Sequence, residues 1–290
     1  MEEKKTKTEK QKESACSILS EAEFLNGRLY KIENCYSEHG SLYNNRLHFH
    51  DFYELSAIYE GKSHFLVNGS LFAMEKRSIQ LVRPADYHRQ QTREGESIRY
   101  YNLTFSPDFL SEPLRLALEE TQEVLCVNAR AEEWKNILLL LQKLHERFLR
   151  EPDTVLSRTY IHSGIEMLCV FLLDRHQQES TPQIQNAHEA VRRAIVFIRK
   201  KYRNPIRLED AAAAAGLSPA YFSSVFHQTM GITFSGYLTE YRLQEAKRYL
   251  QTGELQVKQI AAICGFPSYS YFVTAFKDAF GCTPGKWKRR

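Results

Sequence analysis

The fold of the last third of the chain is decided by a stretch that occurs twice. Residues 206–238 read IRLEDAAAAAGLSPAYFSSVFHQTMGITFSGYL, and residues 257–287 read VKQIAAICGFPSYSYFVTAFKDAFGCTPGKW. Self-similarity at a fixed spacing indicates two copies of one supersecondary unit. The copies match at a constant separation of 50 residues in four pairs, which are Phe222 and Phe272, Phe226 and Phe276, Gly231 and Gly281, and Thr233 and Thr283.

Each copy has the sequence pattern of a helix-turn-helix. A short apolar helix is expected at 208–214 and again at 257–263, and a glycine, Gly216 or Gly265, then allows the positive φ of a sharp turn. Serine and proline after each turn favour the start of a second helix, which buries the paired phenylalanines. A longer helix at 234–252 joins the copies. It spans roughly 28 Å, against about 34 Å between successive major grooves of DNA.

The face opposite the phenylalanines carries short or hydrogen-bonding side chains that could reach base edges. Segment 186–290 has a net charge of +9, whereas the rest of the chain has −5. A helical bundle could show one such polar face by chance, but two in register within a basic segment favour double-stranded DNA as partner. The predicted DNA-contacting residues are Ala220, Ser223, Ser224 and His227 in the first copy, and Ser268, Tyr269, Ser270, Val273, Thr274 and Lys277 in the second.

These motifs resemble the DNA-binding domain of the AraC/XylS family of bacterial transcription regulators. The first copy matches at 212–218 (AxxAGLS), 221–226 (YFSSVF) and 231–247, and the second at 260–266 (IAAICGF), 268–272 (SYSYF) and 281–287 (GCTPGKW). The resemblance implies sequence-specific binding to promoter DNA, with the helices around 219–229 and 268–279 in the major groove. It also implies RNA polymerase as a partner.

Composition indicates a globular chain. Apolar residues make up 43% and charged residues 26% of the 290 residues, and the longest apolar run, 167–173, is far shorter than the about 20 residues that cross a membrane. Residues 1–14 contain no apolar stretch, which argues against a secretory signal peptide and for a cytoplasmic protein. The six cysteines form no C-x-x-C pair, so we expect reduced thiols.

The predicted fold is a multidomain α+β protein. Residues 1–18 are expected to be a disordered tail, 19–178 a cupin-like β-barrel with flanking helices that senses a ligand and dimerises, 179–187 a linker, and 188–290 the all-α DNA-binding domain. Short β-like segments between 27 and 105 support the barrel. Asn68-Gly69 between two apolar runs predicts a tight hairpin.

The β-rich part contains HFHDFYE, in which His48, His50 and Glu54 have the spacing HxHxxxE with Gly61 beyond. This is similar to the first motif of cupin barrels, and RSIQLVRPADYH, ending at His88, is similar to an eroded second motif. The resemblance implies sensing of a small molecule such as a sugar. The predicted ligand-binding residues are Arg46, His48, His50, Glu54, Arg83 and His88.

The same residues admit a second interpretation. His48, His50 and Glu54 share one face of a strand, so together with His88 they could hold a divalent transition metal. Three glycine or proline positions of the second motif are lost, so we expect a pocket without metal or cofactor. A cupin-type enzyme fused to a DNA-binding module is the alternative function, but the DNA-binding module gives little reason for turnover.

Two helices are predicted at 132–149 and 159–175. The first has an apolar stripe that suits either a dimer seam or the covering of the sheet. The family resemblance favours a homodimer through this stripe, which consists of Ile137, Leu138, Leu141, Leu144 and Phe148.

Overall fold

The computed structural model describes residues 17–19, 24–25, 28–39, 47–84, 86–121, 123–151, 153–179 and 187–288. The chain divides into two compact units, residues 19–184 and residues 185–290 with 1–18. The predicted tail up to residue 16, and residues 180–186 of the linker predicted at 179–187, lie outside the described residues. Strand β1 (Ser17–Leu19) begins within the segment assigned to the tail. Within the described ranges, no helix is both long and apolar enough to span a membrane.

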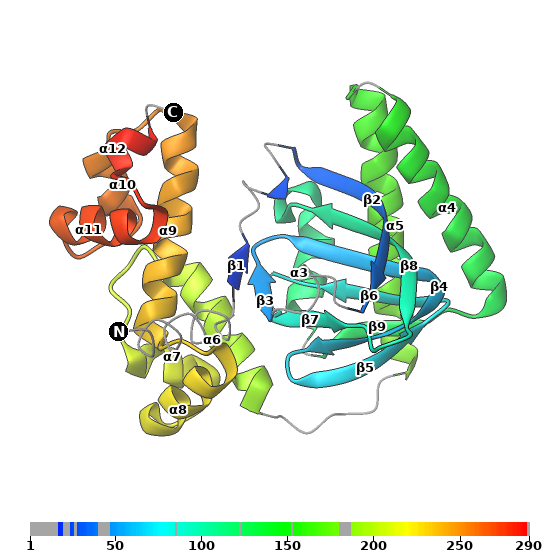
Figure 1. Ribbon diagram of the computed structural model, residues 1–290, viewed down its shortest axis with the longest axis horizontal. Coiled ribbons are helices and arrows are strands. Elements are labelled where there is room, and N and C mark those ends of the chain that lie inside the picture. Colours follow the sequence, from blue (N-terminus) through cyan, green and yellow to red (C-terminus); the bar gives the residue numbers. More distant parts are fainter. Residues whose placement is uncertain are drawn as a thin grey trace. The chain divides into compact units, whose positions relative to one another are not determined.

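The sheet-rich unit is organised around β4 (Tyr53–Val67), whose neighbours change along its length (Figure 1). The first part of β4 pairs with β6 and β8, and the second part pairs with β5 and β7, always antiparallel. Strands β2, β3 and β9 pair with β8, β7 and β6. Their bounds are β2 (Tyr30–Glu38), β3 (His48–His50), β5 (Ser70–Glu75), β6 (Ser78–Val82), β7 (His88–Gln91), β8 (Ser97–Phe105) and β9 (Leu125–Asn128).

The predicted hairpin is confirmed, but the predicted barrel is not closed. Asn68 and Gly69 connect β4 and β5 with φ values of 47° and 80°, as a two-residue hairpin turn requires. Among the described strands, no ladder joins β9 to β2, so the strands form an open sheet rather than a continuous barrel. The α+β class is as predicted, because a sheet-rich unit precedes a helical one.

Helices cover one side of the sheet (Figure 1). The two predicted helices are α4 (Ala131–Arg150) and α5 (Val155–Glu179), and α5 extends four residues beyond its expected range at each end. A 3₁₀ turn at Pro107–Phe109, α3 (Glu112–Glu120) and β9 were not anticipated from the sequence.

The apolar stripe of α4 is interior, and its assignment to a dimer seam is therefore wrong. Leu141 and Leu144 are fully buried in a core shared with the sheet and α5. A Cβ added at Gly164 of α5 would lie only 2.7 Å from Leu144 Cδ2, so the two helices are tightly packed. The outward surfaces of α4 and α5 carry different apolar side chains, which are Leu139, Leu149, Val155, Leu156, Tyr160, Met167 and Val170.

From residue 187 to residue 288 the second unit consists of helices and the turns between them, and it contains both predicted helix-turn-helix copies. Helices α7 and α8 form the first copy, α10 and α11 form the second, and α9 joins them over the predicted range. The bounds are α6 (Ala187–Lys201), α7 (Leu208–Ala215), α8 (Pro219–Met230), α9 (Phe234–Thr252), α10 (Val257–Ile263), α11 (Tyr269–Phe280) and α12 (Pro284–Trp287).

The glycine in the turn of the second copy is required for two reasons. Gly265 has a φ of 77°, and an added Cβ would lie 2.5 Å from Tyr202 O and 2.8 Å from Arg203 O. We expect Gly265→Ala to lower the stability of the helical unit by more than the roughly 1–3 kcal/mol of backbone strain alone. Gly253→Ala is the control, because Gly253 has a φ of 75° and nothing within 4 Å. Thermal unfolding followed by circular dichroism measures both, and equal losses would contradict the close packing at Gly265.

Candidate nucleic-acid interface and ligand pocket

Helix α8, the second helix of the first copy, buries one face and exposes the other. Phe222 and Phe226 are fully buried, and their ring centroids lie 6.2 and 6.4 Å from that of Phe234 on α9. Pro219 begins the helix and Gly231, with a φ of 70°, ends it. The opposite face is exposed and carries all four residues predicted for this copy, Ala220, Ser223, Ser224 and His227.

Helix α11 repeats this arrangement, with one difference from the sequence prediction at Val273. Phe272 and Phe276 are fully buried, and Tyr269, Ser270, Thr274 and Lys277 are exposed. Val273 is half-buried at the edge of the exposed face. Ser268 Oγ accepts a hydrogen bond from the Tyr271 backbone N–H at 3.2 Å, so this side chain caps the helix.

Among the exposed residues that the sequence prediction missed on these helices, three have uncharged side chains that can form hydrogen bonds. Gln228 lies one turn after Ser224, so the i, i+4 spacing that identified the face could have included it. A glutamine can read adenine through two hydrogen bonds, which a serine cannot. The other two are Tyr221 and Tyr271, and Tyr271 Oη lies 3.3 Å from Thr239 Oγ1 on α9.

A polar network ties α9 to the end of α6. Arg242, which is buried, donates through Nε and Nη2 to the backbone carbonyls of Tyr202 and Asn204, both at 2.8 Å. Tyr202 Oη in turn donates to Glu245 at 2.8 Å. Gly265, in the turn of the second copy, packs on the backbone carbonyl of the same Tyr202. The joining helix α9 and the second copy are therefore both fixed to the segment that follows α6.

The sheet-rich unit holds a pocket of about 430 Å³. Alternate residues of β2, β3, β4, β7 and β8 point into it, as expected for strands that present one face to a cavity. Four of the six predicted ligand-binding residues line it, namely His48, His50, Glu54 and His88. The other polar lining residues are Lys31, Glu33, Ser56, Gln90 and Asn102, and the aromatic ones are Phe24, Phe52, Phe65 and Tyr100.

The four predicted residues gather around one carboxylate. His48 and His88 are register partners on β3 and β7, with ring centroids 4.2 Å apart. His50 Nε2 and His88 Nε2 lie 3.1 and 3.3 Å from the same Glu54 Oε2. The other carboxylate oxygen, Glu54 Oε1, accepts a hydrogen bond from Asn102 Nδ2 at 2.8 Å.

Burial and these contacts act in opposite directions on the two titratable groups. Burial lowers the pKa of His50 below its ordinary value, although contact with Glu54 opposes the change. Burial alone would raise the pKa of Glu54, but contacts with His50 and His88 outweigh it and hold the pKa well below its usual range. Glu54 is therefore an anion at neutral pH.

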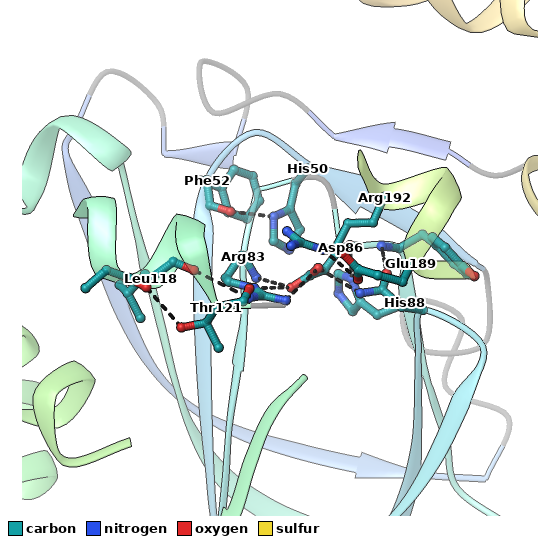
Figure 2. A network of polar contacts seen from close by, with 12 residues as sticks. His50, Phe52, Arg83, Asp86, His88, Leu118, Thr121, Glu189 and Arg192 are labelled. Atoms are coloured by element: carbon teal, nitrogen blue, oxygen red, sulfur yellow. Dashed lines mark hydrogen bonds and ion pairs between the residues drawn. The ribbon is translucent and has the colours of Figure 1, made fainter. Parts of the chain in front are cut away.

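The predicted ligand role of Arg83 is not supported by its position. Arg83 is 2% exposed, and its Nε donates to Asp86 Oδ2 at 2.9 Å (Figure 2). Its Nη1 donates to the backbone carbonyls of Leu118 and Thr121, which fixes the end of α3. The guanidinium is thus used inside the fold and lines no part of the pocket. Arg46, the remaining predicted residue, lies outside the described residues.

The residues present fit a metal ion. His48, Glu54 and His88 each offer one ligand atom, and these atoms lie within 4.8 Å of one another. Two imidazole nitrogens and a carboxylate oxygen suit a first-row transition metal better than magnesium or calcium. In the described part of the chain this is the one such group of histidine, cysteine, aspartate or glutamate side chains.

Comparison with known proteins agrees with this division into a pocket and an interface. Residues 26–195 match the AraC-like ligand binding domain, and residues 211–290 match a helix-turn-helix domain. The uncharacterized HTH-type transcriptional regulator YfiF of Bacillus subtilis is 23% identical over 85% of this chain and 79% of its own length. The HTH-type transcriptional activator RhaR of Pectobacterium atrosepticum is 26% identical over 84% and 86%. An apo form of ToxT from Vibrio cholerae, a solved structure, aligns with a TM-score of 0.45 at 16% identity over 91% and 98%.

Proposed function

Because the chain belongs to the AraC family of transcription regulators, we propose that it reads promoter DNA through α8 and α11 and responds to a small molecule held in the pocket of the sheet-rich unit. DNA binding, transcription regulation and a ligand-binding domain follow from the family itself. The matched domains and relatives are those of regulators and not of enzymes, so the alternative of a cupin-type enzyme is set aside.

One observation carries the assignment of the two reading helices. Both copies bury the same pair of phenylalanines and leave the opposite face of α8 or α11 exposed. This unit has a net charge of +9 from residue 186 onward, which provides the phosphate attraction that sequence-independent affinity requires. The nineteen residues of α9 separate the copies by roughly the spacing of adjacent major grooves.

The two helices would read DNA unequally. The face of α11 offers Thr274, whose methyl and hydroxyl groups can contact a thymine methyl or a base edge, and Lys277, which can reach a guanine or a phosphate. The face of α8 offers Ser223 and Ser224, whose short hydroxyl groups discriminate bases weakly. Gln228 is the residue of α8 best suited to direct reading of a base.

The proposed effector is a small polar molecule of the sugar or polyol class. Hydrogen-bonding groups, such as Lys31, Gln90 and Asn102, lie together with aromatic rings, such as Phe52 and Tyr100, in one pocket. This mixture suits hydroxyl groups on a ring that stacks on an aromatic face.

A thermal-shift screen of the full chain against sugars, polyols and small acids tests this proposal. A compound that binds only the folded state must raise the melting temperature of the sheet-rich unit in proportion to the logarithm of its concentration. We expect Lys31→Ala, which removes a pocket cation, to reduce the shift. Lys62→Ala, outside the pocket and 69% exposed, should leave it unchanged. A screen without shifts, or a shift that both variants retain in full, would count against this pocket.

The remaining partners are part of the same proposal. A homodimer would use the outward faces of α4 and α5, because the inner stripe of α4 is occupied by the core of its own unit. Contact with RNA polymerase at a promoter and action in the cytoplasm are expected of a regulator of this type.

A further inference from the structure

The strand register places Gln80 of β6 on the pocket side of the sheet. Register partners in antiparallel strands point to the same face. Across β2, β8, β4, β6 and β9, one row of partners consists of Glu33, Asn102, Ser56, Gln80 and Cys126. The first three members of this row line the pocket, so Gln80 lies directly beside the pocket residue Ser56. Its neighbours along β6, Ile79 and Leu81, point to the opposite face and belong to the core shared with α4 and α5.

The side-chain amide of Gln80 is buried without a hydrogen-bond partner. Gln80 is 0% exposed, and among the described residues neither its Nε2 nor its Oε1 has a partner. The polar groups beside it are paired, since Ser56 Oγ donates to Asn102 Oδ1 at 3.1 Å and Asn102 Nδ2 donates to Glu54 at 2.8 Å. An amide can form up to four hydrogen bonds, and burying it with none is unfavourable. Gln80 therefore has a hydrogen-bonding capacity that this part of the fold does not use.

A second unpaired polar group lies on the same face. Thr104 of β8 is 1% exposed and stands between Lys31 and Glu54 in the adjacent row, and both of these residues line the pocket. Its Oγ1 also has no hydrogen-bond partner within the described ranges. Buried polar groups are normally paired, so two exceptions that border one pocket indicate a surface suited to the polar groups of a ligand.

The wall beyond Gln80 is adaptable. On the side away from Ser56, the register partner of Gln80 is Cys126, whose Sγ lies 3.3 Å from Met74 Sδ. Both sulfur-containing side chains belong to or pack against an apolar cluster that also includes the pocket residue Phe65. Methionine is unbranched and repacks readily. This part of the wall can therefore make room for a ligand group beside Gln80 without a change in strand pairing.

We propose that Gln80 is a specificity-determining residue of the pocket, whose amide binds two neighbouring hydroxyl groups of the effector. This inference rests on the proposed effector class and deepens it. One hydroxyl group donates to Oε1 while the next accepts from Nε2, so a vicinal diol satisfies the amide completely. An ionised carboxylate can only accept and leaves Oε1 unpaired. The pocket should therefore favour molecules with adjacent hydroxyl groups over acids of the same length.

Thermal unfolding of the full chain with polyol and acid probes tests this proposal. The probes are xylitol and sorbitol, which carry adjacent hydroxyl groups, and 1,5-pentanediol and glutarate, which carry polar groups only at their ends. We expect both polyols to raise the melting temperature of the sheet-rich unit, and the other two probes to raise it less. Gln80→Met keeps the length of the side chain but removes both hydrogen-bonding groups. It should weaken the apparent affinity for the polyols by about tenfold or more, because two hydrogen bonds are lost.

The same variant measured without a probe separates a binding role from a structural one. Gln80→Met should then unfold at the wild-type temperature or above, because an apolar side chain of similar shape replaces an unpaired amide. Leu81→Met is the control, since Leu81 is the next residue of β6 but is buried in the core on the helix-covered face. This volume-conserving change should leave the polyol affinity at the wild-type value.

Three results would overturn the proposal, and they differ in what else they exclude. Equal polyol affinity of the wild type and Gln80→Met would overturn it and leave the proposed effector class intact. A Gln80→Met protein that melts several degrees below the wild type without a probe would show that the amide is already paired in the free protein, for example by an internal water. No shift of the wild type with either polyol would overturn the effector class and this proposal with it.

Discussion

Leu144→Asp is expected to prevent the sheet-rich unit from folding, with a loss of stability of more than about 4 kcal/mol. Leu144 is fully buried between α5 and the sheet, where a carboxylate would have neither water nor a cation. Urea unfolding of the full chain measures the loss. The fluorescence of Trp134 reports on this core, while Trp287 lies in the other unit and gives an internal comparison.

Leu139→Asp is the matched control, because Leu139 lies on the same helix but is 53% exposed. It should leave urea unfolding nearly unchanged, and its sedimentation will report on any dimer through the outer face of α4. If Leu144→Asp instead gave a folded monomer from a wild-type dimer, the stripe of α4 would be an intermolecular seam after all.

Arg83→Met is expected to cost about 3–5 kcal/mol, because it removes the buried ion pair between the Arg83 guanidinium and the fully buried carboxylate of Asp86. The backbone N–H of residue 83 and the amide of Asn68 would still donate to Asp86, but neither neutralises its charge. Adding Asp86→Asn should recover part of the loss, since the buried charge is then removed as well.

Arg93→Met, at an exposed position, is the control and should change stability by less than about 0.5 kcal/mol. Urea unfolding of the four proteins measures the comparison. A stable Arg83→Met protein that had lost only its response to an effector would restore the sequence-based assignment of Arg83 to the ligand site.

The helical unit could be predicted from sequence because its signals are local. Gly216 and Gly265 mark the turns, the phenylalanine pairs mark the buried faces, and both lie within a few residues of the structure that they determine. The cluster at Glu54 was found for a similar reason, because strand parity places His48, His50 and Glu54 on one face. Residue spacing alone could not show that His50 and His88 contact the same oxygen of Glu54, which depends on how β3, β4 and β7 pair.

The sequence-based predictions were wrong where the position of a side chain or strand depends on contacts with residues far away in the sequence. An apolar stripe at helical spacing has the same appearance whether it covers its own sheet or a second chain, so the role of Leu141 and Leu144 could not be read from α4 alone. Arg83 became interior because Asp86 and the carbonyls at the end of α3 surround it, and α3 was not predicted. The open sheet likewise depends on which strand edges meet, which motif spacing does not specify.

Selection from a randomised pool of duplex DNA tests most directly whether α8 and α11 read sequence. The wild-type chain of 290 residues should enrich two unequal half-sites, and Thr274→Ala should change the bases preferred in one of them, at a cost of about 1–3 kcal/mol on the best site. Gln251→Ala, an exposed change on α9 outside both reading helices, should select the wild-type sites. A wild type that enriches no sequence, or a Thr274→Ala protein that selects the same bases with the same affinity, would contradict the account.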